Sequence, residues 1–175
     1  RFMESFRNDL KSVPGVINAS NSNNIFGEDM GNTPYKVYGT NGNKLMNIMF
    51  ADYNFASVYG IEMLKGRYYS EEFRSDTTSI VLNETAAKEL GIADDPIGKQ
   101  IVRAHAEGEV PYVFNVIGIM KDFHFQSLHR RIQSMIIHLY FPNGFGRNVS
   151  VKITAGNIDK KLEDIKNSWH KYAGN

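Results

Sequence analysis

A segment in the middle of the chain, residues 79–101, constrains the fold most, because each change of backbone direction in it falls on a residue suited to that change. A short apolar run ends at Asn83, whose side-chain oxygen can accept hydrogen bonds from the free amides of a helix start. The helix predicted next, of about one and a half turns, ends at Gly91, the usual left-handed terminator. Asp95-Pro96 then predicts a turn, and Gly98 stands where another strand begins. The segment therefore predicts a strand, a short capped helix and a second strand.

An amphipathic helix is predicted at each end of the chain. In the first helix apolar residues recur at helical spacing, and Pro14-Gly15 ends the pattern. In the last helix the apolar stripe runs for about four turns after a cap at Asn157 or Gly156, and it most simply packs on a sheet. The stripe residues are Phe2, Met3, Phe6, Leu10 and Val13 in the first helix, and Ile158, Leu162, Ile165, Trp169 and Tyr172 in the last.

Strands account for most of the sequence between these helices. Residues 21–42 are the exception, because they are rich in Asn, Gly and Ser; they predict a long, mobile surface loop, interrupted at most by a strand at 35–38. A short helix is predicted at 53–59, ending at Gly60. Apolar patterns predict strands at 16–20, 44–51 and 61–64, and a pair at 133–141 and 149–153 that a Pro-Asn-Gly turn joins as a hairpin.

This order of elements predicts an α+β fold with a mixed, mostly antiparallel sheet and packed helices at both ends. The connections are too short for repeated parallel crossovers, each of which needs about a dozen residues or more. The 175 residues suffice for one sizeable domain or two small ones. We expect a boundary between two subdomains near Arg67.

Composition excludes several classes of protein. Hydrophobic residues at 42% and charged residues at 22% are typical of a folded chain. A net charge of +1 provides no overall field that would favour nucleic acid as a partner, and the absence of cysteine excludes disulfides, thiol catalysis and cysteine-ligated metals. No apolar run reaches the roughly 18 residues of a membrane span. Because no signal-peptide pattern accompanies the start at Arg1-Phe2-Met3, we expect a soluble piece of a longer protein.

One cluster of residues could carry chemistry. Asp122, His124 and His129 include a carboxylate and two imidazoles, which can bind zinc or transfer protons. The spacing of five between the histidines does not place them on one helical face, and a third ligand would have to come from His105, His138 or a distant carboxylate. We therefore favour a structural interpretation, in which Asp122 helps to turn the chain while the neighbouring phenylalanines fill a core.

Nucleotide binding and serine hydrolysis find no support in the motifs. Residues 39–44 lack the spacing of a phosphate-binding loop, and Gly98-Lys99 lacks the following hydroxyl residue. Ser127 and Ser134 have no flanking glycine pattern of a nucleophile elbow. The basic residues at 129–131 are most simply solvated charge, although they could meet an acidic partner.

Three ordered motifs resemble the MacB-like periplasmic core domain of FtsX-like ABC-transporter permeases. They are residues 83–87 (Asn-Glu-Thr-Ala-Ala), 95–99 (Asp-Pro-Ile-Gly-Lys) and 117–124 (Ile-Gly-Ile-Met-Lys-Asp-Phe-His). The resemblance extends over nearly the whole chain, with little contribution from residues 20–42. We assign structural rather than binding roles to the residues that match: Asn83, Glu84, Asp95, Pro96, Gly98, Lys99, Gly118, Asp122 and Phe123.

The resemblance implies a fold and a function. It implies a porter-like subdomain formed by residues 1–66 and 131–175, with a smaller αβ subdomain inserted at 67–130. It also implies a non-catalytic domain on the extracytoplasmic, periplasmic face of the bacterial inner membrane, without metal or other cofactor, that transmits ATP-driven movement of membrane helices. The implied partners are membrane helices before and after the domain, a separate ATP-binding subunit or domain, a second copy in a homodimer, and a periplasmic partner protein.

Two other functions remain open at this stage. The chain could be an extracytoplasmic ligand-binding or sensory module that recognises a peptide or small molecule through residues 20–43 and exposed aromatic side chains. It could also be a metal-dependent hydrolase centred on Asp122 and His124, which we consider the weakest of the three hypotheses.

Overall fold

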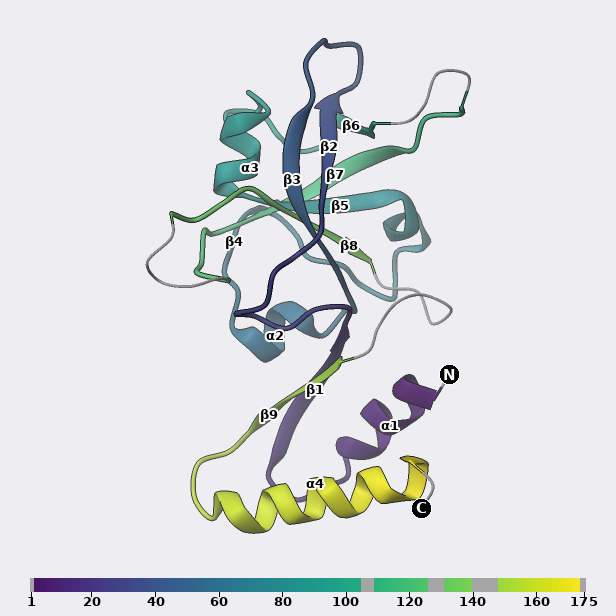
Figure 1. The fold of residues 1–175 in the computed structure, drawn as a ribbon, viewed down its shortest axis with the longest axis vertical. Coiled ribbons are helices and arrows are strands. Elements are labelled where there is room, and N and C mark those ends of the chain that lie inside the picture. The colour runs from purple at the N-terminus through teal and green to yellow at the C-terminus, as the bar shows by residue number, and fades with distance from the viewer. Residues whose placement is uncertain (1, 105–108, 126–130, 140–147, 174–175) are drawn as a thin grey trace.

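Six strands of the described residues pair in a closed ring, to which the other elements are attached (Figure 1). The computed structural model describes residues 2–104, 109–125, 131–139 and 148–173. Strand β2 closes the ring because it pairs with both β3 and β6. The ring continues from β6 to β7, β5, β8 and back to β3. Its members are β2 (Asn32–Val37), β3 (Lys44–Ala51), β5 (Ser79–Asn83), β6 (Gln100–Arg103), β7 (Val113–Met120) and β8 (Met135–Leu139).

The sheet is mixed, which confirms the predicted α+β class. β3 and β8 run parallel, as do β5 and β7, whereas the other ring pairs are antiparallel. Neither parallel pair joins consecutive strands, so the long crossover that parallel pairing requires is supplied by intervening elements. The ring takes strands both from residues 67–130 and from the rest of the chain, and the division into two subdomains stays a prediction.

One core fills the inside of the ring. Alternate residues of the six strands point inward, as expected from the two-residue period of a strand. Helix α3 (Glu84–Glu89) contributes Ala86 and Ala87 to the same core. The largest fully buried members are Tyr35, Met46, Ile80, Leu82, Ile101 and Ile136.

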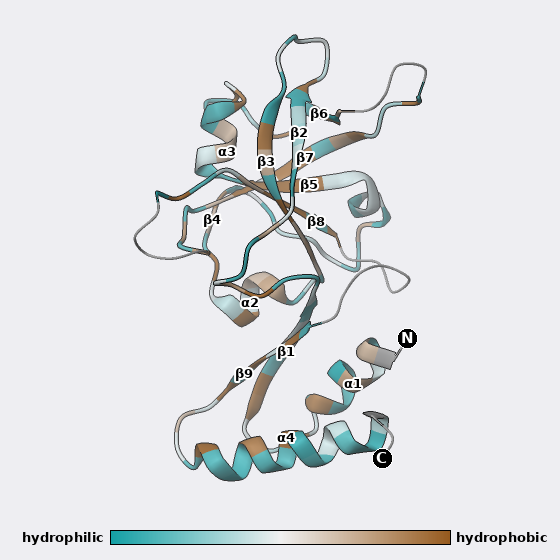
Figure 2. Cartoon of the chain, in the orientation of Figure 1, coloured by the Kyte–Doolittle hydropathy of each residue, from teal (hydrophilic) through white to brown (hydrophobic). Residues whose placement is uncertain are grey.

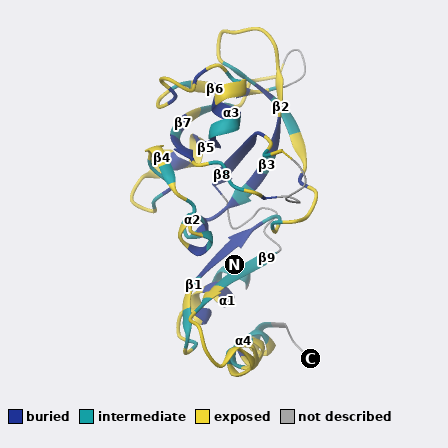
Figure 3. Ribbon diagram, turned by 90° about the vertical axis from the view of Figure 1, so that its left-hand side faces the viewer, coloured by how far each residue is buried: buried dark blue, intermediate teal, exposed yellow. Residues whose placement is uncertain are grey.

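A second core lies on the outer face of the same strands. Met49, Val81 and Ile137 face outward and pack against Phe55 of helix α2 (Phe55–Tyr59) and against Phe125. α2 ends at Gly60 in the left-handed conformation, as predicted. Buried segments lie in the strands where these two cores meet and also in β1 (Val16–Ser22), outside the ring (Figure 3).

The chain ends form a separate base below the ring. Strands β1 (Val16–Ser22) and β9 (Asn148–Ile153) pair antiparallel, and β1 reaches the ring through its pairing with β3. Helices α1 (Phe2–Leu10) and α4 (Ile158–Ala173) lie at this base, with both chain ends on the same side of the molecule (Figure 1). Apolar residues lie along the β1–β9 ribbon (Figure 2), and those facing the helices build a third core that includes Ala19, Val149 and Val151.

The structure corrects the predicted hairpin of residues 133–141 and 149–153. β8 lies in the ring between β3 and β5, whereas β9 pairs with β1, for example Val151 opposite Ala19. The predicted turn at 142–144 falls outside the described residues. Two apolar strands joined by a turn signal are typical of a hairpin, but here each strand pairs with strands far away in the sequence.

The prediction of a long loop at residues 21–42 is also partly wrong. Asn21 and Ser22 continue β1 and are buried, and residues 32–37 form β2. Met30, in the segment that joins these two strands, is buried in the core on the outer face of the ring. Polar composition misled the prediction here, because backbone pairing with β9 extends β1 whatever the side chains are.

Two smaller predictions need adjustment. The strand expected at 61–64 is β4 (Met63–Gly66), which pairs with β7, and a 3-10 helix, Arg74–Thr78, follows it. The stripe of α4 packs only in its second half, where Ile165, Trp169 and Tyr172 contact the base core. Ile158 and Leu162 are each 54% exposed, because α1 and the ribbon do not cover the start of α4.

Candidate functional site

Asn83 joins the start of α3 to strand β8. Its Oδ1 accepts hydrogen bonds from the backbone amides of Ala86 and Met135, both at 2.9 Å, and its Nδ2 donates to the Gln133 carbonyl at 2.9 Å. The predicted helix cap is therefore present, and the same amide also fixes the entry of β8.

Glu84 and Asp122 hold the end of β7 against α3. The Asp122 carboxylate accepts hydrogen bonds from the Thr85 amide at 3.1 Å and the Thr85 hydroxyl at 2.7 Å. In return the Asp122 amide donates to Glu84 Oε2 at 3.0 Å. Carboxylate oxygens at a helix start also interact favourably with the helix dipole. Both carboxylates therefore have structural partners, and Phe123, which follows, packs against the outer core.

Of the candidate metal cluster, only Asp122 and His124 fall within the part of the chain that the structure describes. No group of three or more His, Asp or Glu side chains there is placed to hold a metal ion. Asp122 is engaged by Thr85, while His129 and His105 lie outside the described residues.

The turn between α3 and β6 contains the second motif. Gly98 has a φ of 80°, the left-handed region, and its amide donates to the Val116 carbonyl at 2.8 Å. Pro96 is buried and its carbonyl accepts a hydrogen bond from the Lys99 amide at 3.2 Å. Lys99 and Asp95 form an exposed ion pair at 3.0 Å, which contributes little to stability.

Gly118 lies at the closest approach between β4 and β7. It is opposite Gly66, and a Cβ atom added to Gly118 would lie under 3.0 Å from the carbonyl oxygen of Arg67. The pairing of β5 with β7 shifts register beside it, as is common where a strand carries glycine. The glycine thus allows a backbone contact that a side chain would block.

Asp52 connects α1 to the strands of the base, an arrangement that sequence analysis missed. Its carboxylate accepts hydrogen bonds from Arg7 at 2.6 Å, the Ser20 hydroxyl at 2.7 Å, the Asn21 amide at 2.9 Å and the Asn54 amide at 3.0 Å. Both ionic side chains are buried. The bond to the amide two residues later could have been expected from Asp-Tyr-Asn before a helix. Nothing in the sequence points to Arg7, 45 residues away.

The two terminal helices contact each other through aromatic side chains. The ring of Phe6 lies 4.9 Å from that of Trp169 and 5.7 Å from that of Tyr172, both edge to face. The Tyr172 hydroxyl donates a hydrogen bond to Asp9. This hydrogen bond is the main cause that raises the pKa of Tyr172.

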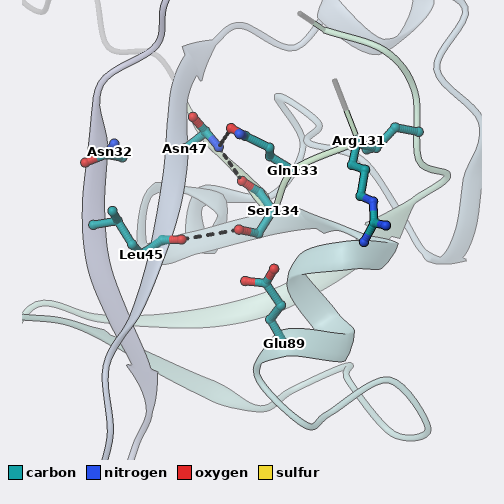
Figure 4. A pocket seen from close by; sticks show the side chains of 8 residues that line it. Asn32, Leu45, Asn47, Glu89, Arg131, Gln133 and Ser134 are labelled. Atoms are coloured by element: carbon teal, nitrogen blue, oxygen red, sulfur yellow. Dashed lines mark hydrogen bonds between the residues drawn. The ribbon is translucent and has the colours of Figure 1, made fainter. Parts of the chain in front are cut away.

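A polar cleft of about 440 Å³ lies between α3, β3 and residues 131–134 (Figure 4). Asn47 lines it and donates hydrogen bonds to Gln133 Oε1 at 3.1 Å and to the Ser134 carbonyl at 2.9 Å. Glu89 extends into it from α3, and Arg131, whose side chain reaches toward the end of the same helix, also lines it (Figure 4).

A comparison with protein families decides the affiliation. The profile of the MacB-like periplasmic core domain matches residues 5–164. The chain belongs to this family. Such domains are the periplasmic parts of MacB-like ABC-transporter permeases, so the resemblance carried by the three motifs is confirmed. A comparison with curated protein sequences gives no match.

Solved structures share the fold of this MacB-like domain. The periplasmic region of MacB from Actinobacillus actinomycetemcomitans has a TM-score of 0.67 at 18% identity, over 96% of this chain and 72% of its own. A domain of a permease protein from Porphyromonas gingivalis has a TM-score of 0.67 at 17% identity. The match covers 94% of this chain and 74% of that domain. The extracellular domain of the noncanonic ABC-type transporter YknZ from Gram-positive bacteria has a TM-score of 0.66 at 16% identity. The match covers 96% of this chain and 82% of that domain. In the described part of the MacB-like domain, no helix is long and apolar enough to cross a membrane.

His138 is an uncharged imidazole inside the ring of this MacB-like domain. Its Nε2 shares a hydrogen bond of 2.8 Å with the Tyr35 hydroxyl, and its ring stacks on Phe50. Burial, with a smaller effect of Arg103, lowers the pKa of His138 from 6.5 to about 3. Burial likewise raises the pKa of Tyr35 to about 12.

We expect His138 to make the domain sensitive to acid. In the unfolded chain His138 binds a proton below about pH 6.5, whereas in the folded chain it does so only near pH 3. The free energy of unfolding therefore decreases as the pH falls from 6.5 toward 3. Urea unfolding at pH 7 and pH 5 should show the loss, with His138→Gln as control because it remains neutral and can still bond Tyr35. The wild type should lose about 2 kcal/mol more than the variant between these pH values. Equal losses in both proteins would contradict the assignment.

Proposed function

We propose that this domain is a non-catalytic lever, which transmits ATP-driven movement of a permease's membrane helices to a substrate or partner protein. The observation that carries the proposal is the base of the molecule, where both chain ends lie on one side and both terminal helices pack together (Figure 1). A body that is held at two adjacent ends can follow the movement of helices attached to those ends.

Buried polar contacts provide a route from the base toward the ring. Asp52 follows β3 directly and bonds to α1 through Arg7, to β1 through Ser20 and to the start of α2 through Asn54. A displacement of α1 therefore acts on Asp52, the residue directly after β3. Lys161 supports the opposite side of the base, since its Nζ donates to the carbonyls of residues 154–156 and so ties α4 to the turn after β9.

The proposal places the domain on the extracytoplasmic face of the bacterial inner membrane. Its partners there would be membrane helices of the same permease, a separate ATP-binding subunit or domain, a second copy in a homodimer and a periplasmic protein. Family membership supports these partners. The structural partners of Glu84 and Asp122 support the absence of a reaction centre, because carboxylates occupied by backbone amides are poorly placed for proton transfer.

A flexible insertion in the base tests the lever. In the full-length permease with its ATP-binding subunit, a short Gly-Ser segment between Ala155 and Gly156 should uncouple α4 from the ribbon. We expect ATP hydrolysis to continue while transport is lost. The cargo of the parent permease, once it is found by comparing cells with and without the permease, provides the transport assay.

The matched control is the same insertion between Gly42 and Asn43, at the exposed tip between β2 and β3. We expect this variant to transport normally. Thermal unfolding of both isolated domains checks that each variant folds. Normal transport by a folded variant with the insertion in the base would contradict the lever.

A ligand-binding or sensory module is the second candidate. The polar cleft favours it, because Asn32 from the Asn-rich segment is among the residues that line it. Binding of a small molecule would not by itself exclude a lever, so the two functions are tested separately.

A further inference from the structure

The polar cleft between α3 and residues 131–134 contains opposite charges that are not paired with each other. Glu89 and Arg131 are both exposed, and within the described residues neither side chain forms an ion pair or a hydrogen bond. Elsewhere on the surface, comparable charges do pair, as Glu62 does with Lys121 at 3.0 Å. The cleft thus presents a carboxylate and a guanidinium that could each bind a group of opposite charge.

Other polar side chains that line the cleft are held in place by hydrogen bonds. Asn47 is only 8% exposed, and its Nδ2 is fixed by Gln133 and Ser134. The Ser134 hydroxyl donates to the Leu45 carbonyl at 3.3 Å (Figure 4). Within the described residues, Asn47 Oδ1 and Gln133 Nε2 have no hydrogen-bond partner. One acceptor and one donor therefore remain in the lining for a bound molecule.

From this arrangement we propose that the cleft binds a small zwitterion, either a free amino acid or the end of a short peptide. The ligand's carboxylate lies against Arg131, which can bind it with two parallel hydrogen bonds, and its ammonium lies against Glu89. A ligand with one charge would leave the other side of the cleft unmatched, whereas a zwitterion matches both. A volume of about 440 Å³ is within the usual range for a small-molecule site. The proposal does not depend on the lever.

Titration of the isotope-labelled 175-residue domain tests the proposal. Glycine represents the free amino acid, diglycine the peptide, and N-acetylglycine and glycine methyl ester each keep only one of the two charges. We expect glycine or diglycine at millimolar concentration to shift the amide resonances of residues that line the cleft. Whichever of the two binds more tightly identifies the source of the zwitterion. The affinity of each singly charged analogue should be lower by a factor of about ten or more.

Charge-removing variants locate the site. Arg131→Gln and Glu89→Gln should each weaken binding about tenfold, because each removes one charged hydrogen-bond partner. Lys166→Gln and Glu163→Gln are the matched controls, since they remove the same charges from the exposed surface of α4 and should leave binding unchanged. The proposal is overturned if neither glycine nor diglycine shifts the cleft resonances, or if either singly charged analogue binds as tightly as the zwitterion. It is also overturned if the α4 variants weaken binding as much as the Arg131 and Glu89 variants do.

Discussion

Replacing Gly118 with alanine should lower the melting temperature of the domain by about 10 °C. The added Cβ would lie against the carbonyl oxygen of Arg67 and 3.0 Å from its carbonyl carbon. These are backbone atoms and cannot rotate away, so β4 must separate from β7 where Gly66 and Gly118 are paired. We expect a loss of about 3 kcal/mol of folding free energy, measured by thermal and urea unfolding.

Two other glycines separate the effect of this contact from the effect of adding a methyl group. Gly31 has open space around the position of a Cβ and is not in the left-handed region, so Gly31→Ala should be almost neutral. Gly98 also has open space but a φ of 80°, so Gly98→Ala should cost about 1 kcal/mol from backbone strain alone. A Gly118→Ala protein that melts within about 2 °C of the Gly31→Ala protein would show that β4 can shift without cost.

Replacing Asp52 with asparagine should cost about 3 to 5 kcal/mol, the usual effect of breaking a buried ion pair from one side. The variant keeps the shape of the side chain but leaves the buried Arg7 guanidinium without its counter-charge. Asparagine also has only one oxygen, whereas the carboxylate accepts four hydrogen bonds with two. Urea unfolding of the isolated domain measures the loss.

Glu62→Gln provides the comparison, because its ion pair with Lys121 has the same chemistry on the exposed surface. It should cost less than about 1 kcal/mol. The double variant Arg7→Met with Asp52→Asn should recover part of the loss, since the unpaired charge is then gone. An Asp52→Asn protein as stable as the Glu62→Gln protein would contradict the proposed role of Asp52 in joining α1 to the strands.

Local patterns predicted much of the secondary structure. The cap at Asn83, the left-handed ends at Gly60 and Gly91 and the strand at 44–51 are where the sequence places them. The cap of α4 is Asn157, whose Oδ1 accepts a hydrogen bond from the Lys160 amide at 3.3 Å. All of these depend on residues within a few positions of each other, so a short stretch of sequence contains the necessary information.

Pairing between distant strands could not be predicted in the same way. β2 closes the ring by pairing Lys36 with Val102, and β9 pairs with β1 across most of the chain length. Alternation of apolar residues identifies a strand and its buried face but does not name its neighbour. The Arg7–Asp52 pair and the cleft at Glu89 and Arg131 were missed for the same reason, since each depends on residues that only the folded chain brings together.

Closure of the ring limits how other proteins can attach. Every ring strand already has a neighbour on both sides, so a foreign strand cannot extend the sheet there, and self-association by strand addition is disfavoured. Among the described strands, only β4 and β9 have a single neighbour. A protein that recognises the ring must therefore use side chains and turns, while backbone-to-backbone recognition is left to the strands outside the ring.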